Sequence, residues 1–139
     1  MFDHLFVARI RLLTSENTVY FPIFFSQYEL SPSGFWRWFS FGMISFYKED
    51  FERTGGFDMT KSGWGEEDVE LAAAFITEKV KINRANDGGL FHPFHNKSCT
   101  NTNDKQKNDC IQTKYSHKAD IFSLYQYYQN KIMKTYLMW

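Results

Sequence analysis

This 139-residue chain has no long apolar run, no net charge and few cysteines. No stretch approaches the ~20 apolar residues of a membrane-spanning helix. The opening MFDHLFVARIRLL is too charged, and its apolar part too short, for a signal peptide, so any targeting segment is expected outside this chain. Lysine plus arginine and aspartate plus glutamate both total 16. The chain therefore lacks the broad electrostatic attraction that draws proteins to nucleic acid or anionic membranes.

The only two cysteines are Cys99 and Cys110, which enclose the polar stretch TNTNDKQKND. That stretch has little to bury, and a disulfide closing it would stabilise the fold by roughly 2.5–3 kcal/mol. Two unrelated thiols in a reducing compartment explain the same sequence. The cysteines alone leave both alternatives open.

Aromatic residues are abundant, at 19% of the chain with 15 phenylalanines. Aromatic rings fill cores, but they also line sugar and nucleotide sites, so the composition fits either role. The length allows one domain with a hydrophobic core.

The sequence pattern predicts a mixed α/β fold without internal repeats. Predicted strands cover residues 19–28, 35–47 and 79–85, and predicted helices cover 48–58, 66–79 and about 117–134. Pro22 favours an edge or irregular strand, and Gly42 favours a bulge or a close backbone approach. A turn is expected at residues 87–89, where Asp-Gly-Gly follows the last strand.

The stretch KSGWGEEDVE, residues 61–70, has two explanations. Acidic residues in a first helical turn are stabilised by the helix dipole, by about 0.3–1 kcal/mol each. That explains the carboxylates but not Trp64, which stands between two glycines. An indole on a glycine-hinged loop beside carboxylates is typical of a lid that stacks on a sugar ring.

A second candidate site is GLFHPFHNK, where His92 and His95 stand three residues apart. Two imidazoles at that spacing can bind one divalent cation if a third ligand comes from elsewhere. Buried, hydrogen-bonded histidines in a phenylalanine-rich stretch are the alternative. A closed structural zinc site is not expected, because no other cysteine or histidine cluster is present.

These segments together resemble the chondroitin N-acetylgalactosaminyltransferases and chondroitin synthases, which are relatives of the β1,4-galactosyltransferases. The resemblance rests on VYFPIFFSQY, on GFWRWFSFGMISFYKEDFERTGGFDMTKSGWGEEDVE, on GLFHPFHNKSC and on CIQTK. It covers residues 5 to 130, with several motifs in the same order and spacing. It implies a secretory protein in which Cys99 and Cys110 form a disulfide that closes the loop 99–110.

The fold implied by the resemblance is the C-terminal part of a GT-A glycosyltransferase, here a single-domain fragment, residues 1–139, with an incomplete nucleotide-binding half. Asp68 matches the general base that deprotonates the acceptor hydroxyl, and Glu67 matches a residue that holds a sugar by hydrogen bonds. Trp64 and Gly65 match the loop that closes over donor and acceptor. A base on the face opposite the leaving group gives inversion.

The metal implied by the resemblance is a divalent ion such as Mn²⁺, which grips the UDP diphosphate. His95 matches its ligand, and His92 stands where relatives have a second one. Trp36 and Arg37 are expected near the nucleotide or acceptor, although an aromatic strand with a solvent-facing arginine explains them as well.

Two substitutions and one absence depart from the family pattern. Glu66 replaces the second glycine of Gly-Trp-Gly-Gly-Glu-Asp, and Glu70 replaces a usual histidine. The family's Asp-x-Asp metal motif lies upstream in relatives, and this chain contains none. We therefore expect either a fragment of a longer enzyme or a truncated product without activity of its own.

The resulting prediction is a hexosyltransferase that moves N-acetylgalactosamine or glucuronic acid from a UDP-sugar to a chondroitin-type chain in the Golgi lumen. The full-length parent is expected to be a type II Golgi membrane protein, and its partners to include another chondroitin synthase subunit. The alternative is a non-catalytic partner that supports an active synthase by assembly.

Overall fold

The computed structural model describes residues 3–29, 33–38, 40–58, 67–96, 98–100, 107, 108, 110, 111 and 114. Its elements in chain order are α1 (His4–Leu13), β1 (Thr18–Gln27), β2 (Gly34–Trp36), α2 (Lys48–Arg53), α3 (Glu67–Thr77) and β3 (Lys81–His92). The strands form one sheet ordered β2-β1-β3, in which β1 is antiparallel to β2 and parallel to β3. The mixed α/β prediction is confirmed, whereas the predicted helix at about 117–134 lies outside the described residues.

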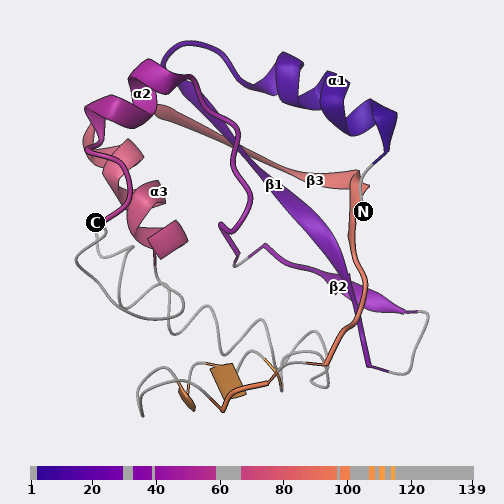
Figure 1. The fold of residues 1–139 in the computed structure, drawn as a ribbon. Coiled ribbons are helices and arrows are strands. Elements are labelled where there is room, and N and C mark those ends of the chain that lie inside the picture. Colours follow the sequence, from indigo (N-terminus) through magenta and orange to yellow (C-terminus); the bar gives the residue numbers. More distant parts are fainter. Residues whose placement is uncertain are drawn as a thin grey trace.

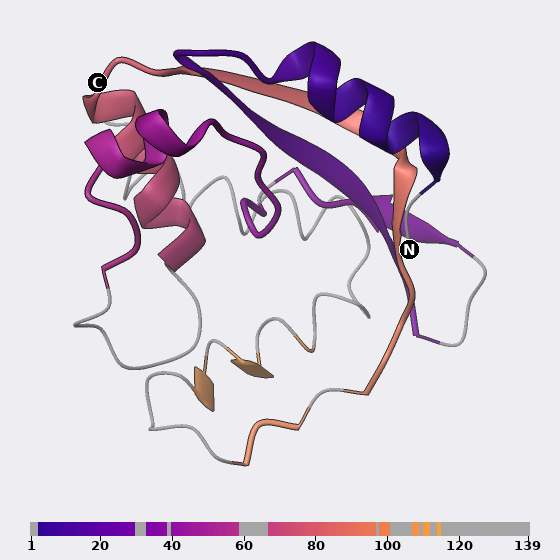
Figure 2. The same cartoon turned by 45° about the horizontal axis from the view of Figure 1, so that its top comes forward.

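Helices cover both faces of the central strand, with α1 on one side and α2 and α3 on the other (Figures 1 and 2). Successive side chains of a strand point to opposite faces. Val19 and Phe21 of β1 accordingly pack in the core with Leu71, Ala72 and Phe75 of α3. Tyr20 and Pro22, between and after them, face α1 instead. Burial on both faces is what a parallel pair such as β1 and β3 requires.

Strand β1 is the centre of the sheet, so the edge position predicted from Pro22 is wrong. Tyr20 exchanges backbone hydrogen bonds with Ser45, and the Phe24 carbonyl accepts one from the Arg37 amide at 2.9 Å. The backbone groups of Pro22, between these positions, point to the same side, where no strand among the described residues pairs with them. The missing proline N–H therefore costs no ladder bond. The predicted irregularity does occur, as a register shift between Ile23 and Phe25.

The strand predicted for residues 35–47 is present only as the short β2. After Trp36 the carbonyls of Trp38 and Ser40 accept hydrogen bonds from the Arg84 side chain rather than from a neighbouring strand. The ladder ends there, and residues 40–44, called the crossing segment here, continue irregularly along β1 to the bridge between Ser45 and Tyr20. The close backbone approach expected at Gly42 is not found: a side-chain carbon there would lie 3.6 Å from Oδ2 of Asp68 and from the Ser40 hydroxyl, which is ordinary van der Waals contact.

Strand β3 is longer than predicted and runs through the expected turn at residues 87–89. Five steps on β3, from Asn86 to Phe91, face two on β1, from Ile23 to Phe25, so the extra residues form a bulge rather than a reversal. The Asp87 carboxylate stabilises the bulge by accepting the Gly89 N–H at 3.0 Å. A local Asp-Gly-Gly pattern cannot reveal that tertiary arrangement.

Helices α2 and α3 form where the sequence predicts helices, whereas α1 was not predicted. Helix α2 ends before Gly55 and Gly56, whose positive φ values of 80° and 74° suit glycine. Helix α1 lacks fully buried side chains, so its sequence shows no clear apolar stripe. Asp3 caps it by accepting the Phe6 N–H at 2.8 Å. Within the described ranges no helix is long and apolar enough to cross a membrane.

Candidate functional site

Asp68 lies in the first turn of α3 and is half-buried. Its Oδ1 accepts the N–H of Val69 at 2.9 Å, while its Oδ2 faces Gly42. Glu67, one residue earlier, begins the helix and is exposed. The structure thus places the Asp68 carboxylate near the crossing segment and leaves the Glu67 carboxylate in solvent. Trp64 and Gly65 lie outside the described residues.

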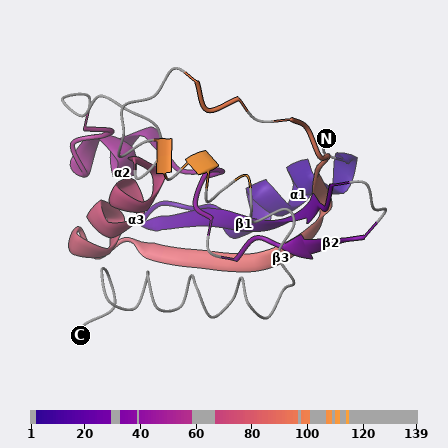
Figure 3. The same cartoon turned by 90° about the horizontal axis from the view of Figure 1, so that it is seen from below.

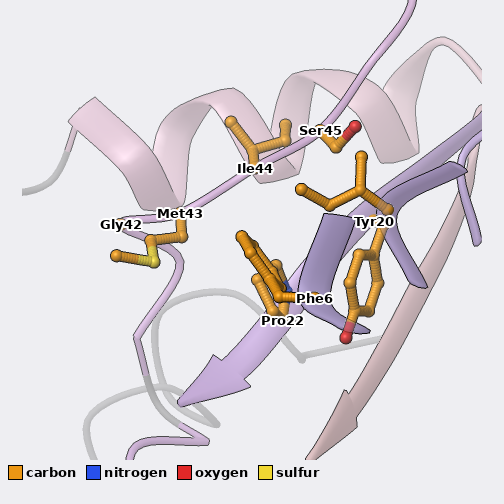
Figure 4. A pocket seen from close by; sticks show the side chains of 8 residues that line it. Phe6, Tyr20, Pro22, Gly42, Met43, Ile44 and Ser45 are labelled. Carbon is orange, nitrogen blue, oxygen red and sulfur yellow. The ribbon is translucent and has the colours of Figure 1, made fainter. Parts of the chain in front are cut away.

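The crossing segment also forms one wall of a pocket of about 410 Å³ between α1 and β1 (Figure 4). The lining residues are Phe6, Ile10, Tyr20, Pro22, Gly42, Met43, Ile44 and Ser45. Most of them are apolar, so the pocket would bind the face of a ring more readily than a charged group. Gly42 lines this wall, and a side-chain carbon at Gly42 would lie 3.6 Å from Oδ2 of Asp68.

Arg84 is a charged residue of this region that the sequence analysis did not single out. It lies on β3 opposite Phe21, and its Nη2 donates hydrogen bonds to the carbonyls of Trp38 at 2.7 Å and Ser40 at 3.0 Å. Its guanidinium lies 3.9 Å from the centre of the Phe41 ring. Burial lowers the pKa of Arg84 to about 10, and attraction to Asp68 opposes that shift. The sequence signal for Arg84 is a single cation inside a predicted strand. The structure adds that its paired residue, Phe21, is fully buried.

The two predicted metal ligands lie together at the other end of β3. The rings of His92 and His95 are 5.2 Å apart between centroids. Nδ1 of His92 lies 3.3 Å from the Ser26 hydroxyl, and Nδ1 of His95 lies 3.4 Å from the Asn96 carbonyl. Metal-binding histidines commonly bond an oxygen through one ring nitrogen in this way while the other faces the metal.

The histidine pair is therefore suited to supply two nitrogen ligands, with Nε2 as the atom that would face a cation. Ring centroids 5.2 Å apart are compatible with two metal–nitrogen bonds of about 2.1 Å at a roughly tetrahedral angle. In the part of the chain that the structure describes, no group of three or more histidine, cysteine, aspartate or glutamate residues could hold a metal ion. The histidine pair can therefore supply two ligands of a metal site, and the described residues supply no third.

The carboxylate and the imidazoles occupy different positions along the sheet. Arg84, near Asp68, pairs with Phe21 of β1, and His92 pairs with Ser26. Five residues of strand correspond to roughly 17 Å. This is the backbone spacing of Arg84 and His92, whereas Asp68 itself lies on α3.

Trp36 and Arg37 lie at the end of the sheet that carries His92 and His95, called the imidazole end here. Both are half-buried. The Trp36 ring contacts Phe25 edge to face at 5.5 Å between centroids. The Arg37 guanidinium lies 5.5 Å from the centre of the Phe24 ring, which in turn lies 5.9 Å from the ring of His92. Arg37 therefore joins the cluster around His92 rather than pointing wholly into solvent.

Cys99 and Cys110 are joined in a disulfide whose Cα atoms lie 5.8 Å apart. The bond ties the segment that follows His95 to a helical turn at residues 110–111. Cys110 is buried and Cys99 is half-buried, so the bond is largely shielded. The imidazole end is thereby fixed on its C-terminal side.

A buried ionic network supports the other face of the sheet. Asp87 is fully buried, forms an ion pair with Arg9 of α1, and accepts the Tyr20 hydroxyl at 2.9 Å. Burial alone would raise the pKa of Asp87, but hydrogen bonds from Arg9, Tyr20 and the Gly89 N–H outweigh it, so the pKa is lowered. Burial, reinforced by Asp87, raises the pKa of Tyr20, which stays a neutral donor. This network fixes α1 above the pocket.

Comparison with known proteins places these features in a wider group. A sequence model of the family described as chondroitin N-acetylgalactosaminyltransferase matches residues 1–124. Chondroitin sulfate N-acetylgalactosaminyltransferase 2 of Mus musculus is 43% identical over 88 residues, which are 63% of this chain and 16% of the relative. Chondroitin sulfate N-acetylgalactosaminyltransferase 1 of Homo sapiens is 33% identical over 136 residues, covering 82% of this chain and 26% of the relative.

A third relative is chondroitin sulfate synthase 3 of Homo sapiens, 32% identical over 145 residues, which cover 91% of this chain and 16% of the relative. The chain thus spans between 16% and 26% of the length of these relatives. No solved structure matches the chain.

Proposed function

The chain belongs to the chondroitin N-acetylgalactosaminyltransferase family, and from this premise we propose that it forms the C-terminal, acceptor-binding part of a GT-A glycosyltransferase. The reaction is transfer of N-acetylgalactosamine, or of glucuronic acid, from a UDP-sugar to a chondroitin-type chain. The observation that carries the proposal is the half-buried carboxylate of Asp68 in the first turn of α3, whose Oδ2 lies toward Gly42.

In this proposal Asp68 is the general base. Its Oδ2 takes the proton from the acceptor hydroxyl as the hydroxyl oxygen forms a bond to the anomeric carbon and the bond from that carbon to UDP breaks. Attack opposite the leaving group inverts the anomeric configuration. General base catalysis typically contributes about 10²–10⁴-fold. Glu67, exposed beside it, holds a sugar hydroxyl by hydrogen bonds.

The imidazole end of the site is assigned to the UDP diphosphate. His92 and His95 would hold a divalent ion such as Mn²⁺ through their Nε2 atoms, and further ligands would come from outside the described residues. When bound, the ion supplies positive charge that stabilises the departing diphosphate. Arg37 and Trp36 approach the same end, and Trp64 and Gly65 provide the loop that closes over the sugars. The site works in the Golgi lumen, where a longer parent chain is anchored.

A second candidate function is that of a non-catalytic partner of an active chondroitin synthase. Glu66 in place of the family's second glycine, and the lack of an Asp-x-Asp motif, favour this alternative. The Glu67–Asp68 pair and the two histidines favour the enzyme. The two functions make opposite predictions for Asp68.

The experiment is a transfer assay with the whole polypeptide that carries these residues. UDP-N-acetylgalactosamine and UDP-glucuronic acid are offered with chondroitin oligosaccharides to the wild type, to Asp68→Asn and to Glu78→Gln, a matched change at the exposed other end of the α3 region. We expect one donor to be used, with transfer lost only in Asp68→Asn. Equal transfer in all three would rule out Asp68 as the base. The partner role would be established by a different result: none of the three proteins transfers sugar by itself, and all three raise the activity of a co-expressed synthase equally.

A further inference from the structure

Arg84 connects the candidate base to the segment that faces it. The guanidinium donates to the carbonyls of Trp38 and Ser40, two residues apart, and covers the ring of Phe41 at 3.9 Å. Gly42, the next residue, donates its N–H to the Ser40 hydroxyl at 3.3 Å, and a side-chain carbon at Gly42 would lie 3.6 Å from Oδ2 of Asp68. One side chain on β3 thus fixes the backbone immediately before the contact with the carboxylate.

The same core ring anchors both sides of that contact. Phe21 lies edge to face with Phe41 at 5.2 Å and with Phe75 of α3 at 6.3 Å. Phe75 is fully buried and fixes α3, whose first turn carries Asp68. Phe41 is only partly buried, so its position depends on what covers it from the other side. Arg84 provides that cover.

Arg84 also brings a positive charge that backbone carbonyls do not neutralise. Its Nη1 atom is buried and has no hydrogen-bond partner in the described structure. With a pKa of about 10, Arg84 remains protonated at neutral pH. Burial lowers this pKa, and the negative charge of Asp68 raises it. The opposite charges of Arg84 and Asp68 therefore attract each other.

We propose that Arg84 is a positioning residue for the transfer reaction. It fixes Trp38, Ser40 and Phe41 through two carbonyls and one ring, and so sets where the Asp68 carboxylate stands relative to the acceptor hydroxyl. The inference rests on the proposed function, since it assigns Arg84 a role through Asp68. Arg84 itself touches no reacting atom.

The test compares Arg84→Gln, Arg84→Lys and Lys81→Gln in the whole polypeptide, with Lys81 as an exposed cation of the same strand. Thermal unfolding identifies variants that fold, and kcat and the KM for the UDP-sugar are measured separately. A misplacement of about 1 Å can cost about 100-fold in rate, so Arg84→Gln is expected to lose about that factor in kcat. Its donor KM should stay within about twofold, because donor contacts are elsewhere.

Arg84→Lys separates positioning from general stability. Lysine keeps the charge, but its compact ammonium cannot span both carbonyls and stack on Phe41 as the planar guanidinium does. We expect a kcat between those of the wild type and Arg84→Gln. This variant decides the question if Arg84→Gln does not fold.

Three outcomes would contradict the proposal: wild-type kcat in folded Arg84→Gln, wild-type kcat in Arg84→Lys, or an equal loss in Lys81→Gln. Each leaves the proposed function intact as long as Asp68→Asn is inactive. Transfer by Asp68→Asn at the wild-type rate removes the proposed function and the role of Arg84 together.

Discussion

At the scale of single residues, the sheet depends on carboxylates that are buried but fully bonded. Asp87 is surrounded by an arginine, a tyrosine hydroxyl and a backbone amide, and Asp50 by an arginine and a backbone amide. Burial of a carboxylate is unfavourable unless such donors replace water. Both residues connect segments distant in sequence, so their contribution is to the fold rather than to the chemistry.

Replacing Asp87 with asparagine should lower the free energy of unfolding by about 2 kcal/mol at neutral pH, the usual value of hydrogen bonds to a charged group. The folded-state pKa of Asp87 is lowered, so its stabilisation is complete above the unfolded-state pKa of about 4 and is lost as the pH falls through the folded-state pKa. Urea unfolding from pH 7 to pH 2 should therefore show the wild type and Asp87→Asn converging in acid. Exposed Glu16→Gln is the control, and a difference that is constant with pH would contradict this assignment.

At the scale of elements, the turn before β1 is attached to α2. Asn17 has a positive φ of 58°, and its N–H bonds to Oδ2 of Asp50 at 2.9 Å. Arg53 donates to both of them, at 2.8 Å to the Asn17 side chain and 2.7 Å to Oδ1 of Asp50. The carboxylate thus couples a strained turn to a helix of six residues.

Asp50→Ala should lower the free energy of unfolding by about 1–3 kcal/mol, because the Asn17 N–H loses its acceptor. Glu49→Gln changes an exposed carboxylate one residue away and should have almost no effect. Chemical denaturation of the two variants beside the wild type measures the difference. Equal stabilities of both variants would show that the turn does not need Asp50.

At this scale, elements that depend on neighbouring residues were predicted correctly, and elements that depend on contacts distant in sequence were not. Helices α2 and α3 and strand β1 were predictable, because glycine stops, helical spacing and an aromatic run are local features. The shortness of β2 was not, since it depends on Arg84 bonding to Trp38 and Ser40 from 44 or more residues away. Helix α1 and the bulge in β3 depend on the Arg9–Asp87 pair, which no window of neighbouring residues contains.

At the scale of the whole molecule, α3, whose first turn carries Asp68, lies toward one end of the sheet in Figure 3, and β3, which ends at His92, runs toward the other end. The motifs around Asp68 and His95 could be found from sequence, because each is a short run of chemically distinctive residues. The spacing of roughly 17 Å along the sheet between Arg84 and His92 could not, since it follows from the β1–β3 register. Arg84 was missed for the same reason: its role arises only when the fold brings its side chain within hydrogen-bond distance of Trp38 and Ser40.

This separation predicts different effects for the two ends. His95→Ala should raise the Mn²⁺ concentration required for half-maximal transfer at least about tenfold, and should be partly overcome by excess Mn²⁺. His4→Ala, which removes an exposed histidine of α1, is the control. Transfer rates measured across a Mn²⁺ titration give the result. An unchanged requirement in His95→Ala would exclude it as a ligand.

The most direct measurement of the central claim is the single-turnover transfer rate of Asp68→Asn at saturating UDP-sugar and Mn²⁺, because it isolates the chemical step from binding. The account predicts a rate at least about 100-fold below that of the wild type, as expected when a general base is removed. A rate within about twofold of the wild type, in a variant that folds normally, would contradict it.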